Sequence, residues 1–259
     1  MVLTEARLDS DQAERGGETG SQPSVAVVVP TYNEAENLPE FVRRLFELDI
    51  SISSLIVVDD GSPDGTGEVA AELARQYDGR LILIQRGKKL GLGTAYIVGF
   101  SRALAEGADY VLQMDADLSH DLEYIPDFVN ELGTVDVVVG SRYVPGGGVE
   151  ASWSFSRRLL SSLGNLGIRA ITGLKVKDAT SGFKAFRGSV LGSMDLSQFR
   201  CKGFGFQAEV AHACQRSDYN VLEYPIVFAS RTRGRSKMEF AIMVEAVWRL
   251  LLLRWNRNP

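Results

Sequence analysis

The chain has little of the chemistry that builds disulfide frameworks and the commonest zinc centres. Among its 259 residues are two cysteines, Cys201 and Cys214, which we interpret as reduced core thiols of a cytosolic protein. The only two histidines, His120 and His212, argue against a histidine-based zinc site. The sequence therefore disfavours both disulfide-stabilised and zinc-binding scaffolds.

The sequence shows no pattern of a signal peptide in its first residues and no long apolar run. Residues 1–22 are polar and contain no apolar core segment, so we predict a disordered tail there rather than a secretory signal. The segment Phe240–Trp255 is apolar nearly all round, but Glu245 and Arg249 interrupt it. Its apolar runs fall short of the roughly 20 residues that a membrane span needs. We therefore expect no spanning helix.

Charge is unevenly distributed along the sequence. The formal net charge is −5, yet residues 231–259 hold seven basic and two acidic residues and carry +5, which leaves −10 for the rest. A basic end on an acidic protein favours an anionic partner, although a solvated helix face is the alternative. We expect no nucleic acid among the partners.

Short apolar runs alternate with helical segments through the first half. The predicted strands are Val25–Val29, Leu55–Val58, Leu81–Gln85, Tyr110–Met114 and Asp136–Gly140, and the predicted helices are Glu34–Leu48, Thr66–Tyr77, a segment from the glycine-rich turn at Gly91 to Ala105, and Leu122–Leu132. Because the strands are continuous apolar runs, they favour a parallel sheet covered on both faces. Ligands of such sheets bind beyond the carboxyl ends of the strands.

Beyond residue 145 the alternation loosens. We expect a helix from about Ser154, a strand within Thr180–Arg187, a short helix over Gly205–Arg216, a strand over Asn220–Phe228 and a helix over Phe240–Trp255. The segments together predict an α/β fold with a mostly parallel, Rossmann-like sheet and helices on both faces in residues 23–237. Residues 238–259 are predicted to form an amphipathic helix.

Two acidic residues stand where the strand Tyr110–Met114 should end. Negative charge from Asp115 and Asp117 at the mouth of a sheet is costly unless a cation is near. Mg²⁺ or Mn²⁺ carrying a diphosphate meets that need, because hard cations take carboxylate and phosphate oxygens. The pair therefore predicts a metal-bound diphosphate at this edge of the sheet.

The other common nucleotide motifs are missing. Lys88 and Lys89 precede the glycines instead of following them as in a Walker A loop, and Pro30–Asn33 occupies the first turn in place of a dinucleotide fingerprint. A metal-bridged nucleotide-sugar fits better, because Asp60 supplies a further acid after the second strand.

Four blocks of the chain together resemble the polyprenol- or dolichol-phosphate mannose synthases, which are inverting GT-A glycosyltransferases of family 2. The blocks are Val29–Glu34, Val58–Thr66, Lys89–Tyr96 and Met114–His120. The likeness covers about residues 24–240 and implies a GT-A fold. It implies transfer of mannose from GDP-mannose to a polyprenyl monophosphate, with inversion.

The resemblance also implies the roles of donor-side residues. Five of them should line the guanosine pocket: Pro30, Tyr32, Glu34, Val58 and Asp60. A carboxylate can accept hydrogen bonds from both N–H donors at the edge of guanine, which is a physical reason for an acidic residue at position 60. Asp115 and Ala116 should flank the ribose and diphosphate, and Asp117 should hold the Mg²⁺ or Mn²⁺. Arg231 and Lys237 should close over the diphosphate.

On the acceptor side the resemblance implies a phosphate clamp made of Arg142, Arg157 and Ser161. Arg157 and Ser161 share a helix face at i, i+4, and phosphate recognition needs such a cluster. The alternative is that Arg157 and Arg158 only form a solvated helix face. Gln207 and Glu209 resemble a helix that supports the catalytic loop.

The basic and apolar end of the chain has two interpretations. It packs against the domain, or it lies on a membrane with its arginines at the headgroups, which we favour. We therefore expect a peripheral protein on the cytoplasmic face of a membrane, with a possible membrane-anchoring protein partner. Two alternatives to mannosyl transfer stay open: glucosyl transfer from UDP-glucose, and a non-catalytic nucleotide-sugar-binding regulatory subunit.

Overall fold

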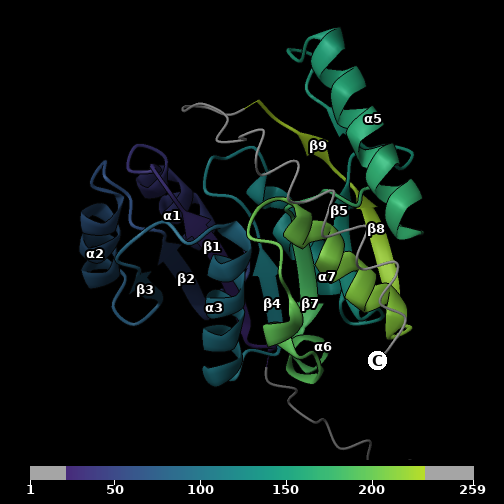
Figure 1. Cartoon of the computed structure of the whole chain (residues 1–259). Coiled ribbons are helices and arrows are strands. Elements are labelled where there is room, and N and C mark those ends of the chain that lie inside the picture. Colours follow the sequence, from purple (N-terminus) through teal and green to yellow (C-terminus); the bar gives the residue numbers. More distant parts are fainter. Residues whose placement is uncertain (1–21, 231–259) are drawn as a thin grey trace, which may run out of the picture.

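The predicted apolar runs form the central sheet of the computed structural model, which describes residues 22–230 (Figure 1). The strand order is β3-β2-β1-β4-β7-β5-β8. The strands are β1 (Val25–Thr31), β2 (Ser54–Asp59), β3 (Leu81–Gln85), β4 (Tyr110–Gln113), β5 (Val137–Ser141), β7 (Lys184–Arg187) and β8 (Val221–Pro225). Within this sheet β7 is antiparallel to both β4 and β5, and the other neighbours are parallel. The predicted α/β fold with a mostly parallel sheet is confirmed.

Helices cover both faces of the sheet. On one face lie α1 (Leu38–Phe46), α2 (Thr66–Gln76) and α4 (Ile125–Glu131), which follows a 3₁₀ turn at Leu122–Tyr124; on the other lie α3 (Leu92–Ala105), α6 (Gly188–Ser193) and α7 (Gly205–Arg216). A short 3₁₀ turn, Leu196–Gln198, joins α6 to α7.

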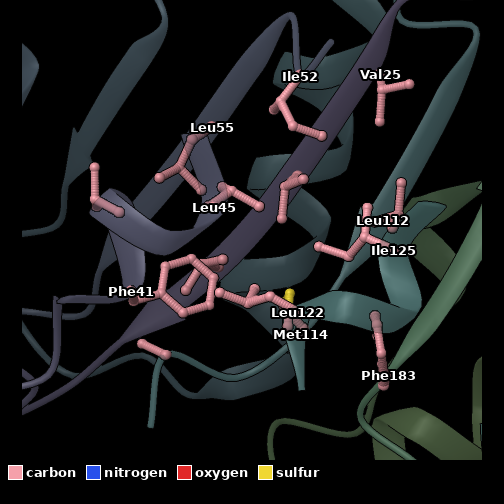
Figure 2. Close-up of a cluster of buried hydrophobic side chains, with 14 of the residues drawn as sticks. Val25, Phe41, Leu45, Ile52, Leu55, Leu112, Met114, Leu122, Ile125 and Phe183 are labelled. Carbon is pink, nitrogen blue, oxygen red and sulfur yellow. The ribbon is translucent and has the colours of Figure 1, made fainter. Parts of the chain in front are cut away.

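Strand β1 explains why the apolar runs do not alternate with polar residues. Val25, Val27 and Val29 pack with the helix α1 side, whereas Ala26 and Val28 pack with the α3 side. Figure 2 shows the first of these clusters, in which Phe41 and Leu45 of α1 meet the strands. Burying one such side chain fully contributes roughly 1.5–3 kcal/mol.

The first helix begins later than its sequence predicted. We expected it from Glu34, but α1 begins at Leu38. Asn33 has a left-handed backbone with φ of 55°. The amides of Asn33 and Glu34 donate to Ser62 and to the Thr66 hydroxyl, so the loop after β2 holds this segment out of the helix.

The expected strand Asn220–Phe228 is two strands. Strand β8 ends at Pro225, and β9 (Val227–Phe228) leaves the main sheet to pair in parallel with β6 (Gly148–Val149). Helix α5 (Phe155–Thr172) follows β6 and stands away from the sheet, at the upper right of Figure 1. The second half therefore builds an added layer beside the sheet.

Residues 231–259 lie outside the described range, and so do residues 1–21. The predicted tail, the predicted helix over 238–259, and Arg231 and Lys237 therefore stay predictions. Among the helices of residues 22–230, none has an apolar stretch of the length that a bilayer span requires.

Candidate functional site

The acidic pair lies where β4 ends, as predicted. Asp117 is 4% exposed, and its Oδ1 accepts the amide hydrogen of Ser119 at 3.1 Å. Leu118 between them has a left-handed φ of 59°, which turns the chain sharply after Asp117. Asp115 is more open, with 29% of its side chain exposed. The loop thus presents two carboxylates at the sheet edge, one of them held by its own backbone.

His120 is a site residue that the sequence analysis did not single out. Its ring is buried between Phe183 and Phe228, and Nε2 lies 3.8 Å from Oδ2 of Asp115. Neither ring nitrogen has a hydrogen-bond partner among the described residues. Burial lowers the pKa of His120 to about 4, although Asp117 opposes the shift, so the ring is neutral near pH 7.

Asp60, which we predicted to contact the guanine of the donor, is buried and already has protein partners. Its oxygens accept the amides of Leu90 at 2.7 Å and Gly91 at 2.8 Å, and Nη2 of Arg86 lies 2.6 Å from Oδ1. Burial lowers the pKa of Arg86 while Asp60 opposes the shift. The predicted pairing of Asp60 with guanine would have to share or replace these contacts, and it stays a prediction.

The other predicted pocket residues are placed differently from one another. The side chain of Val58 is fully buried against α3, so only its backbone is available to a ligand. Pro30 pairs with Val58 in the sheet register. Tyr32 lies under the ammonium of Lys89, which is 4.4 Å from the ring centroid. Glu34 accepts a hydrogen bond from Asn37 at 2.7 Å.

The glycine-rich turn at the start of α3 is a packing feature. A Cβ on Gly93 would stand 2.1 Å from the carbonyl oxygen of Cys201, and the Gly93 amide donates to the carbonyl of Lys202 at 2.9 Å. Gly91 has φ of 106°, a backbone angle that residues with a side chain rarely adopt. Because these positions are glycines, residues 201–202 can pack against the loop whose amides donate to Asp60.

Arg142 follows β5 and forms a buried ion pair that the sequence did not predict. Its Nε and Nη2 donate to the two carboxylate oxygens of Asp178, both at 2.7 Å, and Nη2 also donates to Thr180 at 2.8 Å. Burial alone would raise the pKa of Asp178, but the hydrogen bonds from Arg142 hold it below its usual value. Asp178 therefore fixes the plane of the guanidinium.

Helix α5 presents the other predicted acceptor residues. Arg157 is exposed, and its guanidinium stacks 3.6 Å from the ring centroid of Trp153. The Ser161 hydroxyl is 2.9 Å from the hydroxyl of Tyr143, the neighbour of Arg142. Arg158 instead donates to backbone carbonyls, including that of Trp153 at 3.1 Å. Of the adjacent arginines, Arg158 supports the turn before α5, whereas the binding role of Arg157 stays a prediction.

A family model described as glycosyl transferase family 2 matches residues 26–194. The chain belongs to this family. It is 41% identical over 232 residues to an undecaprenyl-phosphate mannosyltransferase of Micrococcus luteus, covering 90% of this chain and 93% of that one. It is 40% identical over 225 residues to a polyprenol monophosphomannose synthase of Mycolicibacterium smegmatis, covering 86% and 84%. The predicted resemblance to polyprenol-phosphate mannose synthases is confirmed.

Solved structures of another glycosyltransferase share the fold. The chain resembles glucosyl-3-phosphoglycerate synthase from Mycobacterium tuberculosis in complex with Mn²⁺, UDP and phosphoglyceric acid, with a TM-score of 0.64 and 19% identity over 92% of this chain and 80% of that one. A second complex of that protein, with Mn²⁺, UDP and glucosyl-3-phosphoglycerate, gives a TM-score of 0.64 and 21% identity, covering 92% and 81%. At this identity the likeness supports the fold alone.

The acidic pair of this family 2 chain suits a hard cation that keeps other ligands. Among residues 22–230 there is no group of three or more His, Cys, Asp or Glu side chains that could hold a metal ion by itself. Asp115 and Asp117 can supply carboxylate oxygens, and substrate phosphate and water fill the rest of a typical Mg²⁺ shell. The residues therefore fit Mg²⁺ or Mn²⁺ bound together with a diphosphate.

Gln207 does support the end of β4, but through buried contacts. Its Oε1 accepts from Nε2 of Gln113 at 2.6 Å and from Nζ of Lys184 at 2.7 Å. Burial lowers the pKa of Lys184 to about 7, although Asp178 opposes the shift. Glu209 instead accepts the amides of Arg200 and Cys201. Gln207 thus supports the strand before Asp115, and Glu209 supports the segment beside Gly93.

Proposed function

We propose that the protein transfers mannose from GDP-mannose to a polyprenyl monophosphate with inversion, giving a β-linked polyprenyl-phosphate mannose. One observation carries the proposal. The acidic pair after β4 and Arg142 after β5 lie close together, because the Phe228 ring contacts both the Arg142 guanidinium, at 5.5 Å, and His120, whose Nε2 is 3.8 Å from Oδ2 of Asp115. One side thus suits a metal-bound diphosphate and the other an anionic acceptor. The names of the two relatives at 40–41% identity support the same donor and acceptor classes.

On the donor side, Asp117 would hold Mg²⁺ or Mn²⁺, and Asp115 and Ala116 would flank the ribose and the diphosphate. The ion, when bound, supplies positive charge that stabilises the departing GDP. We propose that Arg231 and Lys237 add charge there, and that the base lies against the loops carrying Tyr32 and Asp60. The ammonium of Lys89, 4.4 Å from the centroid of the Tyr32 ring, adds positive charge at this place.

On the acceptor side, no general base is needed. A phosphate monoester is already an anionic oxygen nucleophile near neutral pH. Arg142, Arg157 and Ser161 would therefore bind and orient it rather than deprotonate it, and catalysis follows from positioning and leaving-group stabilisation. The ring of His120, buried between Phe183 and Phe228, would pack there and take no proton.

Helix α5 supports association with a lipid surface. Five of its side chains are exposed and apolar: Phe155, Leu159, Leu160, Leu163 and Leu166. Their exposed fractions include 80% for Phe155 and 71% for Leu160, and apolar exposure on this scale marks interaction surfaces. We propose that this helix, with the segment 238–259, rests on the cytoplasmic face of a membrane. A membrane-anchoring protein partner stays a proposal.

Donor choice is tested by thermal unfolding of the full chain with each nucleotide-sugar. GDP-mannose with Mg²⁺ at 100 times its Kd should add about 2.7 kcal/mol, or about 5–10 °C in Tm. UDP-glucose should protect much less. Equal or better protection by UDP-glucose would point to glucosyl transfer instead.

The acceptor clamp is tested with Arg157→Ala. Loss of one charge-assisted phosphate contact costs about 1.5–3 kcal/mol, or about 10- to 150-fold in efficiency with polyprenyl phosphate. GDP-mannose binding by calorimetry should stay near wild type, and Arg75→Ala on the exposed face of α2 is a matched control. Weakened donor binding with normal acceptor efficiency would move Arg157 to the donor side.

A further inference from the structure

The short strand β9 connects parts of the site that are far apart in the sequence. Just after it, the amide of Ala229 donates to the carbonyl of Ser119, in the loop of the acidic pair, at 2.9 Å. On its other side, the amide of Glu150 donates to the carbonyl of Phe228 at 2.9 Å, and Glu150 precedes the turn that leads into α5. The backbone at Phe228 and Ala229 therefore joins the loop of the acidic pair to the segment that leads into α5.

The side chain of Phe228 repeats this bridge. Its ring meets His120 edge to face, with centroids 5.0 Å apart and an interplanar angle of 83°. It meets Trp153 in the same way, at 5.7 Å and 88°. The guanidinium carbon of Arg142 lies 5.5 Å from the ring centroid.

Each of these neighbours leads to a proposed functional group. His120 lies beside Asp115, and Trp153 carries the stacked guanidinium of Arg157 on its ring. Arg142 is itself an arginine of the proposed clamp. The Phe228 ring thus contacts Arg142 directly, reaches Arg157 through Trp153 and reaches the acidic pair through His120.

We infer that Phe228 is a positioning residue that keeps Arg142 and, through Trp153, Arg157 aligned with the acidic pair. This inference rests on the proposed function. A flat ring with two rotatable bonds holds edge-to-face and cation–π contacts that a branched or flexible apolar side chain cannot reproduce. Phe228 reaches Arg157 only through Trp153. Replacing the Phe228 ring should therefore reduce the contribution of Arg157 to acceptor binding, although Arg157 itself remains.

Phe228→Leu tests the inference, with Phe199→Leu as a matched control. Phe199 is also partly buried and meets Phe206 edge to face at 5.6 Å, but it lies on the segment before α7. Transfer from GDP-mannose to polyprenyl phosphate should lose about 10- to 100-fold in efficiency for Phe228→Leu, from the loss of two aromatic contacts and one cation–π contact. GDP-mannose binding should stay near wild type, and Phe199→Leu should transfer normally.

The decisive measurement is the double variant with Arg157→Ala. In the Phe228→Leu background, removing Arg157 should cost less than in wild type, whereas in the Phe199→Leu background it should cost the same as in wild type. A purely structural role would lower Tm and leave the two losses additive, which would overturn the inference, as would normal efficiency of Phe228→Leu. If Phe228→Leu does not fold, Phe228→Met fills similar space without a ring and should show the same coupling. Absence of transfer by the wild type would instead refute the proposed function.

Discussion

Replacing Asp178 with asparagine should damage the acceptor side of the site while leaving the donor side intact. Asp178 is fully buried and accepts three hydrogen bonds from Arg142, from its backbone amide, Nε and Nη2. Asparagine keeps the shape of the side chain but has one acceptor oxygen, so its amide group would face an N–H donor of Arg142. The guanidinium, whose side chain is 11% exposed, would also lose its counter-charge.

The size of the effect follows from burial. Losing a charge-assisted hydrogen bond costs about 1.5–3 kcal/mol, and removing one partner of a buried pair costs about 3–5 kcal/mol. Because the asparagine side chain would keep one acceptor, we expect about 3 kcal/mol, or about 6–12 °C in Tm for a chain of this size. The folded-state pKa of Asp178 is lowered, so its carboxylate stabilises the fold above the ordinary value of 3.8 and less as pH falls below it.

The assay compares Asp178→Asn with Asp136→Asn, a carboxylate at the opposite end of β5 that accepts the amide of Asn220 at 2.9 Å. Thermal unfolding at pH 7 should show the large loss for Asp178→Asn alone, and the loss should shrink below about pH 4. At a temperature where both variants are folded, Asp178→Asn should lose about 10-fold or more in efficiency with polyprenyl phosphate and keep normal GDP-mannose binding. Equal stability and acceptor kinetics in the two variants would refute the argument that Asp178 orients Arg142.

Three further outcomes are expected. Gly93→Ala should lower Tm strongly because its Cβ would meet the Cys201 carbonyl at 2.1 Å, whereas Gly164→Ala, with nothing within 4 Å, should raise helix stability by about 0.5–1 kcal/mol; equal Tm values would contradict this. Burial lowers the pKa of Lys184 to about 7, so above pH 7 the unfolded chain holds a proton that the folded chain has lost. The stability of wild type relative to Lys184→Met, measured by urea unfolding, should therefore rise between pH 7 and 10 by up to about 1.4 kcal/mol per unit, and a flat difference would count against it. Asp117→Ala should abolish the Mg²⁺-dependent part of thermal protection by GDP-mannose, and retained protection would exclude it as the metal anchor.

The sheet could be predicted from the sequence because its strands carry a strong local signal. The runs that form β1, β2 and β4 are apolar on both faces, and each ends in polar residues at the sheet edge. The late start of α1 could not be predicted from local sequence, because the Asn33 amide donates to the hydroxyl of Ser62, which lies 29 residues further along the chain. The same holds for β9, whose pairing with β6 joins two short segments with little pattern of their own.

The site was predictable where charge stands at a strand end, as for Asp115, Asp117 and Arg142. It was not predictable where a side chain is positioned by a partner far away in the sequence. Asp178 lies in a loop with no periodic signal, yet it sets the orientation of Arg142. Asp60 was identified as an acid at the right edge, but its contacts with the Leu90 and Gly91 amides come from the tertiary fold.

The most direct test of the central claim is transfer itself. The full chain is incubated with GDP-[¹⁴C]mannose, Mg²⁺ and a polyprenyl phosphate, and the lipid is then extracted and counted. We predict label in the organic phase that requires the acceptor and the metal and is lost in Asp117→Ala, with little label from UDP-[¹⁴C]glucose. Label that stays in the aqueous phase with GDP-mannose, or enters the lipid more readily from UDP-glucose, would contradict the proposed mannosyl transfer.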